Sequence, residues 1–302
     1  MHYSTFLRPA GAALALSALT ATVAPAASAE SDDTHPRGPI TVAHRGASAT
    51  VPENTLAAID EARDMGIDWV ENDVQRAKDG ELVIMHDDTL ARTTDVEQKF
   101  PDRAPWKVAD FTWKEISTLD AGSWKGEKWA GLKVPNLEQY MNRVERNHQR
   151  LVFEIKKPEL YPGIELQTLR ELRKLGWLDR RHVAKKLVIQ SFSADSIRTV
   201  HALRPDIKTG FLGTPPVAEL PSYAAFADQI NSNHTTVSAD YYKAVHALKG
   251  PHGRQLENYT WTVDDPARAV QLAEWGADGI ITNKPDEIAK ALADADFEVE
   301  NG

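Results

Sequence analysis

The chain contains no cysteine among its 302 residues. This absence excludes disulfide bonds, zinc–thiolate sites, iron–sulfur clusters and a cysteine nucleophile. Any metal ion that the protein holds must therefore be bound by oxygen or imidazole ligands. The composition is otherwise that of an ordinary globular protein, with 26% charged and 42% hydrophobic residues. The length suits one domain of about 250 residues.

Basic residues are outnumbered: 35 lysines and arginines stand against 44 acidic residues, for a formal net charge of −9. Because nucleic-acid phosphates favour basic surfaces, nucleic acid is not an expected partner. If the protein binds an anion, the positive charge must be local. A metal ion or a few well-placed arginines and lysines would supply it.

Long hydrophobic runs are also missing, so no transmembrane anchor is predicted. The apolar run 11–23 is too short to span a bilayer; Arg8 precedes it and Ala27-Ser28-Ala29 follows it. This order is typical of a secretory signal peptide that is cleaved near Ala29, which predicts a secreted protein. The expected segments are a signal peptide at 1–29, a linker at 30–39, a folded domain at 40–293 and a short acidic tail at 294–302.

Apolar strand-like segments alternate with amphipathic helical segments from residue 40 onward. The predicted strands are 40–43, 68–74, 82–85, 151–155, 187–190, 207–212, one within 229–237, 259–263 and 279–282. The predicted helices are 54–65, 137–146, 164–175, 194–203, 217–226, 241–248, 266–275 and one that opens at 285. About eight such units in roughly 250 residues predict an α/β fold, a TIM (β/α)8 barrel. A small insert follows the second strand, at about 95–133.

A doubly wound open sheet is the alternative fold. Such a sheet usually has a glycine-rich GxGxxG turn after its first strand. The corresponding turn here is Arg45-Gly46-Ala47-Ser48, which lacks that pattern and favours the barrel.

Three carboxylates lie near the ends of predicted strands, where the chemistry of a barrel takes place. Glu71 and Asp73 are two residues apart on one strand, so their side chains leave the same face. Glu154 and Lys156 are spaced in the same way on the strand after the insert. Isolated buried charges must be paired or must bind a metal. Two interpretations stay open: an oxygen-rich site for Ca²⁺ or Mg²⁺, or an ion-pair network with Arg45 and Lys156.

Two histidines stand at strand ends beside these carboxylates. His44 ends the first predicted strand, and His86 ends the strand that follows the Asp79-Gly80 turn. A histidine titrates near neutral pH and suits a general acid or a general base. A lone histidine is more often a structural hydrogen bonder, but a pair beside three carboxylates favours catalysis.

Short motifs surround these polar residues along the whole chain. Up to residue 138 they are His44-Arg45-Gly46, Pro52-Glu53-Asn54-Thr55, Glu71-x-Asp73, Lys78-Asp79-Gly80, His86-Asp87, Leu90-x-Arg92-Thr93-Thr94, Asp120-Ala121-Gly122-Ser123-Trp124 and Val134-Pro135-x-Leu137-Glu138. Beyond it they are Glu154-x-Lys156, Ser191-Phe192, Trp261-Thr262-Val263-Asp264-Asp265 and Asp278-Gly279-Ile280-Ile281-Thr282-Asn283. In this order and spacing, over about residues 40–290, the chain resembles the glycerophosphodiester phosphodiesterase family.

The resemblance implies a TIM barrel with a bound divalent cation. Ca²⁺ is the first choice and Mg²⁺ the alternative, held by the residues that match Glu71, Asp73 and Glu154. Glu53, in the family's PENT segment, is expected to support the first loop and the start of its helix rather than to bind the metal.

The resemblance also implies roles for the remaining site residues. His44 and His86 match the family's acid and base, and Arg45 and Lys156 match residues close to the phosphate. Trp261 ends a predicted strand, where it would form either a wall of the glycerol pocket or part of the core.

Two features of the sequence stand apart from this pattern. Asn72 occupies a position that is usually apolar in the family, and its side chain should point away from Glu71 and Asp73. The insert holds half of the chain's eight tryptophans: Trp106, Trp113, Trp124 and Trp129. We expect them to form a small subdomain core; a lid over the site is the alternative.

The function predicted from the sequence is hydrolysis of glycerophosphodiesters to glycerol 3-phosphate and an alcohol, through a cyclic phosphate. The leaving alcohol is open, and teichoic acid units are among the candidates. Two alternatives remain. One is a phospholipase D-like hydrolase of lysophospholipid or sphingolipid head groups. Enzymes of that family usually have disulfides, so the absence of cysteine argues against this alternative. The other is a barrel that only binds phosphoesters.

Overall fold

The computed structural model describes residues 1–2 and 38–297. Apart from its first two residues, the predicted signal peptide at 1–29 lies outside the described residues. So do most of the linker and residues 298–302 of the acidic tail. Cleavage near Ala29 and secretion therefore stay predictions. In the part of the chain that is described, no helix has the length and hydrophobicity needed to cross a membrane.

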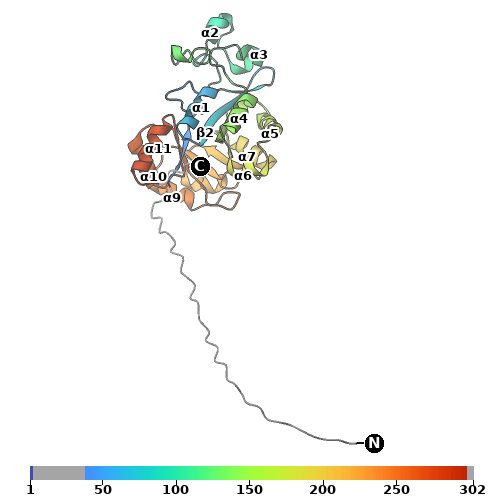
Figure 1. The fold of residues 1–302 in the computed structure, drawn as a ribbon, viewed down its shortest axis with the longest axis vertical. Coiled ribbons are helices and arrows are strands. Elements are labelled where there is room, and N and C mark those ends of the chain that lie inside the picture. The colour runs from blue at the N-terminus through green and yellow to red at the C-terminus, as the bar shows by residue number, and fades with distance from the viewer. Residues whose placement is uncertain (3–37, 298–302) are drawn as a thin grey trace. The chain divides into compact units, whose positions relative to one another are not determined.

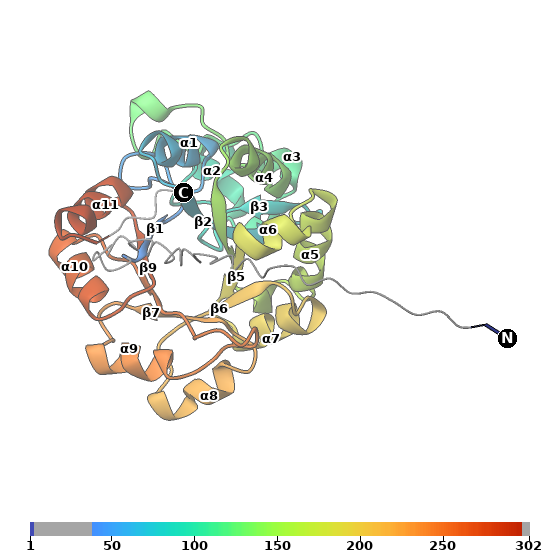
Figure 2. The same cartoon turned by 60° about the horizontal axis from the view of Figure 1, so that its bottom comes forward.

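Parallel strands form the centre of the folded unit, and helices surround them (Figures 1 and 2). The strands are β1 (Ile40–Ala43), β2 (Trp69–Arg76), β3 (Leu82–Ile84), β4 (Arg150–Ile155), β5 (Leu187–Ser191), β6 (Lys208–Leu212), β7 (Gln229–Asn233), β8 (Tyr259–Trp261) and β9 (Gly279–Thr282). Their order in the sheet is β1-β9-β8-β7-β6-β5-β4-β2-β3. Pairing of β1 with β2, at Val42↔Trp69 and Ala43↔Val70, closes a parallel barrel to which antiparallel β3 is added. The predicted TIM barrel is confirmed.

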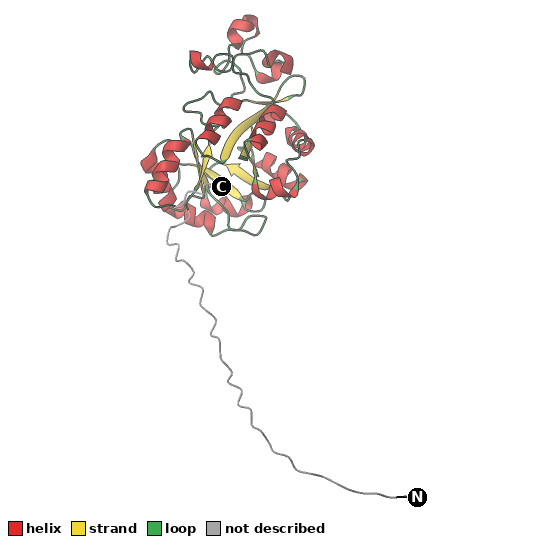
Figure 3. Cartoon of the chain, viewed as in Figure 1, coloured by secondary structure: helices red, strands yellow, loops and turns green. Residues whose placement is uncertain are grey.

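The helices lie outside the strands (Figure 3). Around the barrel they are α1 (Leu56–Asp64), α4 (Leu137–Arg146), α5 (Ile164–Lys174), α6 (Arg180–Lys185), α7 (Ala194–Leu203), α8 (Leu220–Tyr223), α9 (Ala239–His246), α10 (Pro266–Glu274) and α11 (Pro285–Asp294). Side-chain caps fix several helix starts. Thr55 accepts a hydrogen bond from the Ala58 N–H at the start of α1, and Asn136 forms a capping box with Gln139 on α4.

Two helix predictions need correction, and one helix was missed. Helix α1 begins at Leu56, not at residue 54, because Asn54 has a left-handed φ of 58° and cannot continue a right-handed helix. The predicted helix 217–226 is a 3₁₀ turn followed by the single turn of α8. Helix α6 was not predicted; it is six residues long, too short for a periodic pattern, and Asp179 caps its start.

The insert between β3 and α4 contains α2 (Val96–Lys99) and α3 (Trp113–Ile116) and packs around an apolar core to which Ala77 and Val83, outside the insert, also belong. The members of that core are Ala77, Val83, Met85, Leu90, Val96, Val108, Phe111, Ile116, Leu119, Ala121 and Val134. The tryptophans do not form this core, contrary to expectation. Trp106 and Trp113 pack at its edge, and Trp124 is 39% exposed.

Asn72 on β2 is fully buried. Neither its amide oxygen nor its amide nitrogen has a hydrogen-bond partner among the described residues. An apolar side chain would avoid the desolvation cost of this amide, so the departure from the family pattern carries an energetic penalty.

Candidate active site

The strand ends enclose a cavity of about 110 Å³. Seven of the eight residues predicted to form the site line this cavity: His44, Arg45, Glu71, His86, Glu154, Lys156 and Trp261. The eighth, Asp73, does not line the cavity, but its carboxylate lies beside those of Glu71 and Glu154, which do. The barrel thus brings together residues that lie up to 217 positions apart in the chain.

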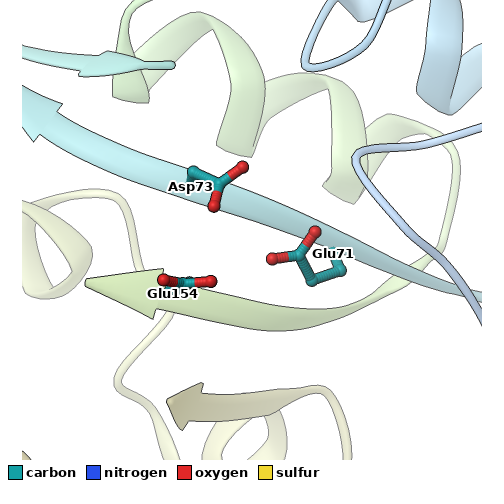
Figure 4. Close-up of side chains that lie close together, drawn as sticks. All are labelled: Glu71, Asp73 and Glu154. Carbon is teal, nitrogen blue, oxygen red and sulfur yellow. The ribbon is translucent and has the colours of Figure 1, made fainter. Parts of the chain in front are cut away.

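The three carboxylates form one buried cluster. Glu71 and Asp73 project from β2 and Glu154 from β4, and the three side chains converge (Figure 4). One oxygen of each lies within 4.8 Å of the others. Strand register produces this arrangement, because Asp73 lies directly opposite Glu154 in the β2–β4 pair.

Burial and mutual repulsion separate the pKa values of the three carboxyl groups. Burial, followed by the charges of Asp73 and Glu154, raises the pKa of Glu71 well above its usual range. Burial and the charge of Asp73 raise the pKa of Glu154 to about 8. Burial opposes ionisation of Asp73 too, but Lys156 and Arg45 outweigh it and hold the pKa of Asp73 below its usual range. Three buried carboxylates therefore lack enough positive charge to ionise together.

Two cations partly neutralise the cluster. The ammonium of Lys156 lies 2.9 Å from Glu154 Oε1 and 3.3 Å from Asp73 Oδ1. Arg45 Nε lies 3.5 Å from Asp73 Oδ2, and the Arg45 backbone N–H donates to Glu71 Oε2 over 3.0 Å. The ion-pair network considered from the sequence therefore exists. Because it supplies two positive charges for three carboxylates, it does not exclude a metal ion.

The turn after β1 brings its backbone close to the cluster. Arg45 and Gly46 both have left-handed φ angles, 57° and 81°. A Cβ on Gly46 would lie 2.6 Å from backbone and side-chain atoms of Ala58, so only glycine fits there. The turn is therefore packed directly against α1, and the Ala47 N–H donates to the Ala58 carbonyl.

His44 is held by a chain of polar groups at the end of β9. Its Nδ1 lies 2.8 Å from Asn283 Oδ1. The orientation of that amide is set because Asn283 Nδ2 donates to Asp264 Oδ2 and Ser48 Oγ donates to Asn283 Oδ1. Since an amide oxygen only accepts, His44 must carry its proton on Nδ1, and Nε2 is left unprotonated, 4.0 Å from Glu71 Oε2. Burial and the neighbouring charge of Arg45 lower the pKa of His44 to about 4.

His86 has a charged partner instead. Its Nδ1 lies 2.7 Å from Asp87 Oδ1, and Arg92 donates to both oxygens of Asp87. Arg92 also donates to both oxygens of Glu53, and Glu53 accepts from Arg45 Nη1 over 2.9 Å. A continuous chain of ion pairs therefore links the environment of His86 to the turn that carries Arg45.

Two aromatic side chains, Phe192 and Trp261, also line the cavity. Trp261 stacks edge to face on Phe192, with ring centroids 5.3 Å apart, and its Nε1–H donates to the Asn231 carbonyl. It also packs against a buried apolar cluster inside the barrel. Trp261 thus lines the cavity and also packs against the barrel core, and its contact with the glycerol stays a prediction.

Sequence reasoning gave no role to Asn283, Asp264, Asp87 or Arg92, although all four stand in the recognised motifs. Their function depends on partners that are distant in the chain, such as Asn283 and His44, which are separated by 239 positions. Glu53 was expected to support the first loop; the structure places it between two arginines and outside the acidic cluster.

The profile of the glycerophosphoryl diester phosphodiesterase family matches residues 44–287, which include every residue of this site. The chain belongs to this family. It is 36% identical over 260 residues to a glycerophosphodiester phosphodiesterase of Bacillus subtilis, covering 82% of this chain and 84% of that one. It is 35% identical to a glycerophosphodiester phosphodiesterase of Caldanaerobacter subterraneus, covering 82% of this chain and 96% of that one.

A solved structure of a phosphodiesterase has a similar fold. An Oleispira antarctica phosphodiesterase, in complex with the product sn-glycerol-3-phosphate, superposes with a TM-score of 0.71 at 28% identity. The match covers 85% of this chain and 97% of that one. The present chain is accordingly an enzyme, a phosphoric diester hydrolase of the glycerophosphodiester phosphodiesterase family.

Proposed function

We propose that this enzyme cleaves a glycerophosphodiester to glycerol 3-phosphate and a free alcohol, in a metal-dependent reaction with His44 as base and His86 as acid. The observation that carries the proposal is the cavity itself. Two histidines with different partners face one buried cluster of three carboxylates, and two cations stand beside it.

The acidic cluster fits a hard divalent cation. Its donors are all carboxylate oxygens, which suit Ca²⁺ or Mg²⁺. Asp73 Oδ1 is buried and accepts no hydrogen bond within the described residues, and Lys156 and Arg45 leave one negative charge uncompensated. Glu71, Asp73 and Glu154 would hold the ion, which when bound would act as a Lewis acid on the phosphate oxygens. We take Ca²⁺ as the first candidate.

Arg45 and Lys156 would bind the phosphate. A phosphodiester resists attack because its own negative charge repels nucleophiles, and charge grows on the non-bridging oxygens in the transition state. The guanidinium and the ammonium are fixed by buried carboxylates before substrate arrives. Such preorganised charges stabilise the transition state without having to reorient.

The different partners of the two histidines support a different proposed role for each. His44 presents an unprotonated Nε2 because its Nδ1 proton is held by an amide oxygen, so it can accept a proton. His86 Nδ1 lies against the carboxylate of Asp87 instead of an amide oxygen, and on this difference in partner we give His86 the role of proton donor. We propose that His44 removes the proton from the attacking oxygen and that His86 protonates the leaving alcohol.

The first nucleophile is proposed to be the 2-hydroxyl of the glycerol. Its oxygen attacks phosphorus and loses its proton to His44, while the bond to the leaving alcohol breaks and that alcohol takes a proton from His86. Water then opens the resulting cyclic phosphate. An intramolecular nucleophile has a large proximity advantage over water. Equal turnover of a 2-deoxyglycerol diester would contradict this step but leave the histidine roles intact.

A change of leaving group tests the two histidines separately. A p-nitrophenyl diester of glycerol phosphate has a leaving group that departs without protonation. His86→Ala should therefore lose about 10²–10⁴ in turnover of a choline or inositol diester but much less on the aryl diester. His44→Ala should lose turnover on both. The reverse pattern would overturn the assignment, and near-wild-type turnover in either variant would refute the two-histidine mechanism.

We further propose that the enzyme is exported. The support is the order of Arg8, the apolar run 11–23 and Ala27-Ser28-Ala29. N-terminal sequencing of the secreted protein should begin at Glu30; an intact Met1 would contradict export by this route.

A further inference from the structure

A second cavity of about 520 Å³ adjoins the catalytic cavity. The two cavities share His44, Arg45 and Thr262. The first contains the acidic cluster and the two aromatic side chains, so it suits the phosphate and the glycerol. The alcohol on the other side of the phosphate would then extend into the second cavity, where Trp124 and Lys125 of the insert are among the lining residues.

The two carboxylates in the second cavity are already satisfied. Glu53 accepts hydrogen bonds from Arg45 and Arg92. Asp264 accepts from the Thr282 hydroxyl and from both the backbone and side-chain N–H groups of Asn283. Neither acid is free to attract a positively charged ligand.

Lys125 is different, because among the described residues no carboxylate lies within ion-pair distance of it. Its ammonium donates to the Ser48 carbonyl over 2.7 Å. Burial lowers the pKa of Lys125, although Glu53 opposes this. The other lysine of the cavity, Lys284, pairs with Glu287. The positive charge that is left for a ligand is therefore that of Lys125.

The aromatic ring in this cavity does not favour a cationic ligand. The Lys125 ammonium lies 5.4 Å from the centre of a Trp124 ring, and the Arg92 guanidinium lies 6.0 Å from it. Asp87 and Glu53 already balance the charge of Arg92, but a quaternary ammonium that approached Trp124 would meet the unbalanced ammonium of Lys125. Like-charge repulsion therefore opposes the usual aromatic recognition of choline.

The loop that carries Lys125 is fixed in place. Asp120 accepts hydrogen bonds from the N–H groups of Gly122, Ser123 and Gly131. A Cβ on Gly122 would lie 1.8 Å from the Trp129 carbonyl oxygen, so the loop closes tightly on itself. The ammonium of Lys125 is thereby held over the cavity before any ligand binds.

We propose that the second cavity binds the leaving alcohol, and that Lys125 selects an alcohol that itself carries a negative group, such as a second phosphate. This inference rests on the proposed function and specifies its substrate class. Zwitterionic and cationic leaving groups would be poorer substrates.

Three diesters of glycerol phosphate provide the test: one with inositol, one with inositol that carries a further phosphate, and one with choline. Wild-type kcat/KM should be highest for the phosphorylated diester and lowest for the choline diester. Lys125→Met should lower kcat/KM for the phosphorylated diester by about 10- to 100-fold and change the inositol value by less than about twofold. Lys125→Arg should keep the preference.

Lys128→Met is the matched control. Lys128 lies three residues away in the same loop, stacks on Trp129 and does not line the cavity. It should change none of the three values. Equal wild-type rates on all three diesters, or an equal loss on all three in Lys125→Met, would overturn the inference alone. Failure of the wild type to cleave any diester would instead refute the proposed function and the inference with it.

Discussion

In the metal-free enzyme, the acidic cluster should make folding stability depend on pH. The pKa of Glu154 rises from 4.5 to about 8 on folding, because burial and Asp73 disfavour its charged form. A carboxyl group whose pKa is raised stabilises the folded state below its unfolded pKa, and this stability is lost as the pH rises through the folded pKa. Folding lowers the pKa of His44 from 6.5 to about 4. Between these two pH values His44 therefore makes the folded state more stable as the pH rises, which opposes the effect of Glu154. The clearest window is therefore pH 6.5 to 8.

The size of the effect follows from the shift in pKa. Between pH 6.5 and a folded pKa of about 8, Glu154 spans 1.5 pH units. At about 1.36 kcal/mol for each unit, Glu154 should cost the chelated enzyme about 2 kcal/mol of stability over this window, and Glu71, whose pKa is also raised, adds to the loss. For a domain of this size that corresponds to a fall in Tm of about 4–8 °C. Bound Ca²⁺ should suppress the loss, because it favours the ionised carboxylates and displaces their protons.

Chemical denaturation in chelator at pH 6.5, 7, 7.5 and 8 measures the effect. Glu154→Gln keeps the shape of the side chain without its charge, so its stability should fall by about 2 kcal/mol less than wild type over the window. Glu274→Gln, at an exposed position on α10, is the matched control and should follow wild type. The reasoning is refuted if Glu154→Gln keeps the full wild-type pH dependence, or if Ca²⁺ leaves the dependence unchanged.

Three further substitutions probe separate parts of the account. Asn283→Leu removes the acceptor that orients His44, so kcat should fall by about 10- to 100-fold while metal affinity by calorimetry stays unchanged; loss of metal binding would show that Asn283 has another role. Asn72→Val replaces a buried amide that has no partner, and urea denaturation should show a gain of about 1–3 kcal/mol; a loss would mean that the amide is satisfied in solution. Gly122→Ala forces a Cβ onto the Trp129 carbonyl and should cost about 1–3 kcal/mol; unchanged stability would show that the loop relaxes freely.

The barrel and the composition of its site could be predicted because both follow from short-range patterns. Strands that are apolar on both faces alternate with amphipathic helices, and residues such as Glu71 and Asp73 share a face because of their spacing. The partners of the histidines could not be predicted in the same way. That Asn283 contacts His44 while Asp87 contacts His86 depends on how loops distant in the chain meet, and our proposed acid and base roles rest on these contacts.

The packing of the insert could not be predicted from the sequence either. Its tryptophan content suggested that the tryptophans form the core, but the buried residues there are aliphatic residues and Phe111. Trp124 instead faces the second cavity, because the hydrogen bonds of Asp120 and the close approach at Gly122 fix its loop. No periodicity in the sequence indicates such a loop.

The most direct test of the central claim is ³¹P NMR of the products from the inositol diester of glycerol phosphate, with and without chelator. The mechanism predicts one phosphorus product, glycerol 3-phosphate, preceded by a transient cyclic phosphate. It also predicts that turnover stops in chelator and returns with added Ca²⁺ or Mg²⁺. Release of inositol phosphate, or full turnover in chelator by an enzyme that carries Glu71→Gln and Asp73→Asn, would contradict it.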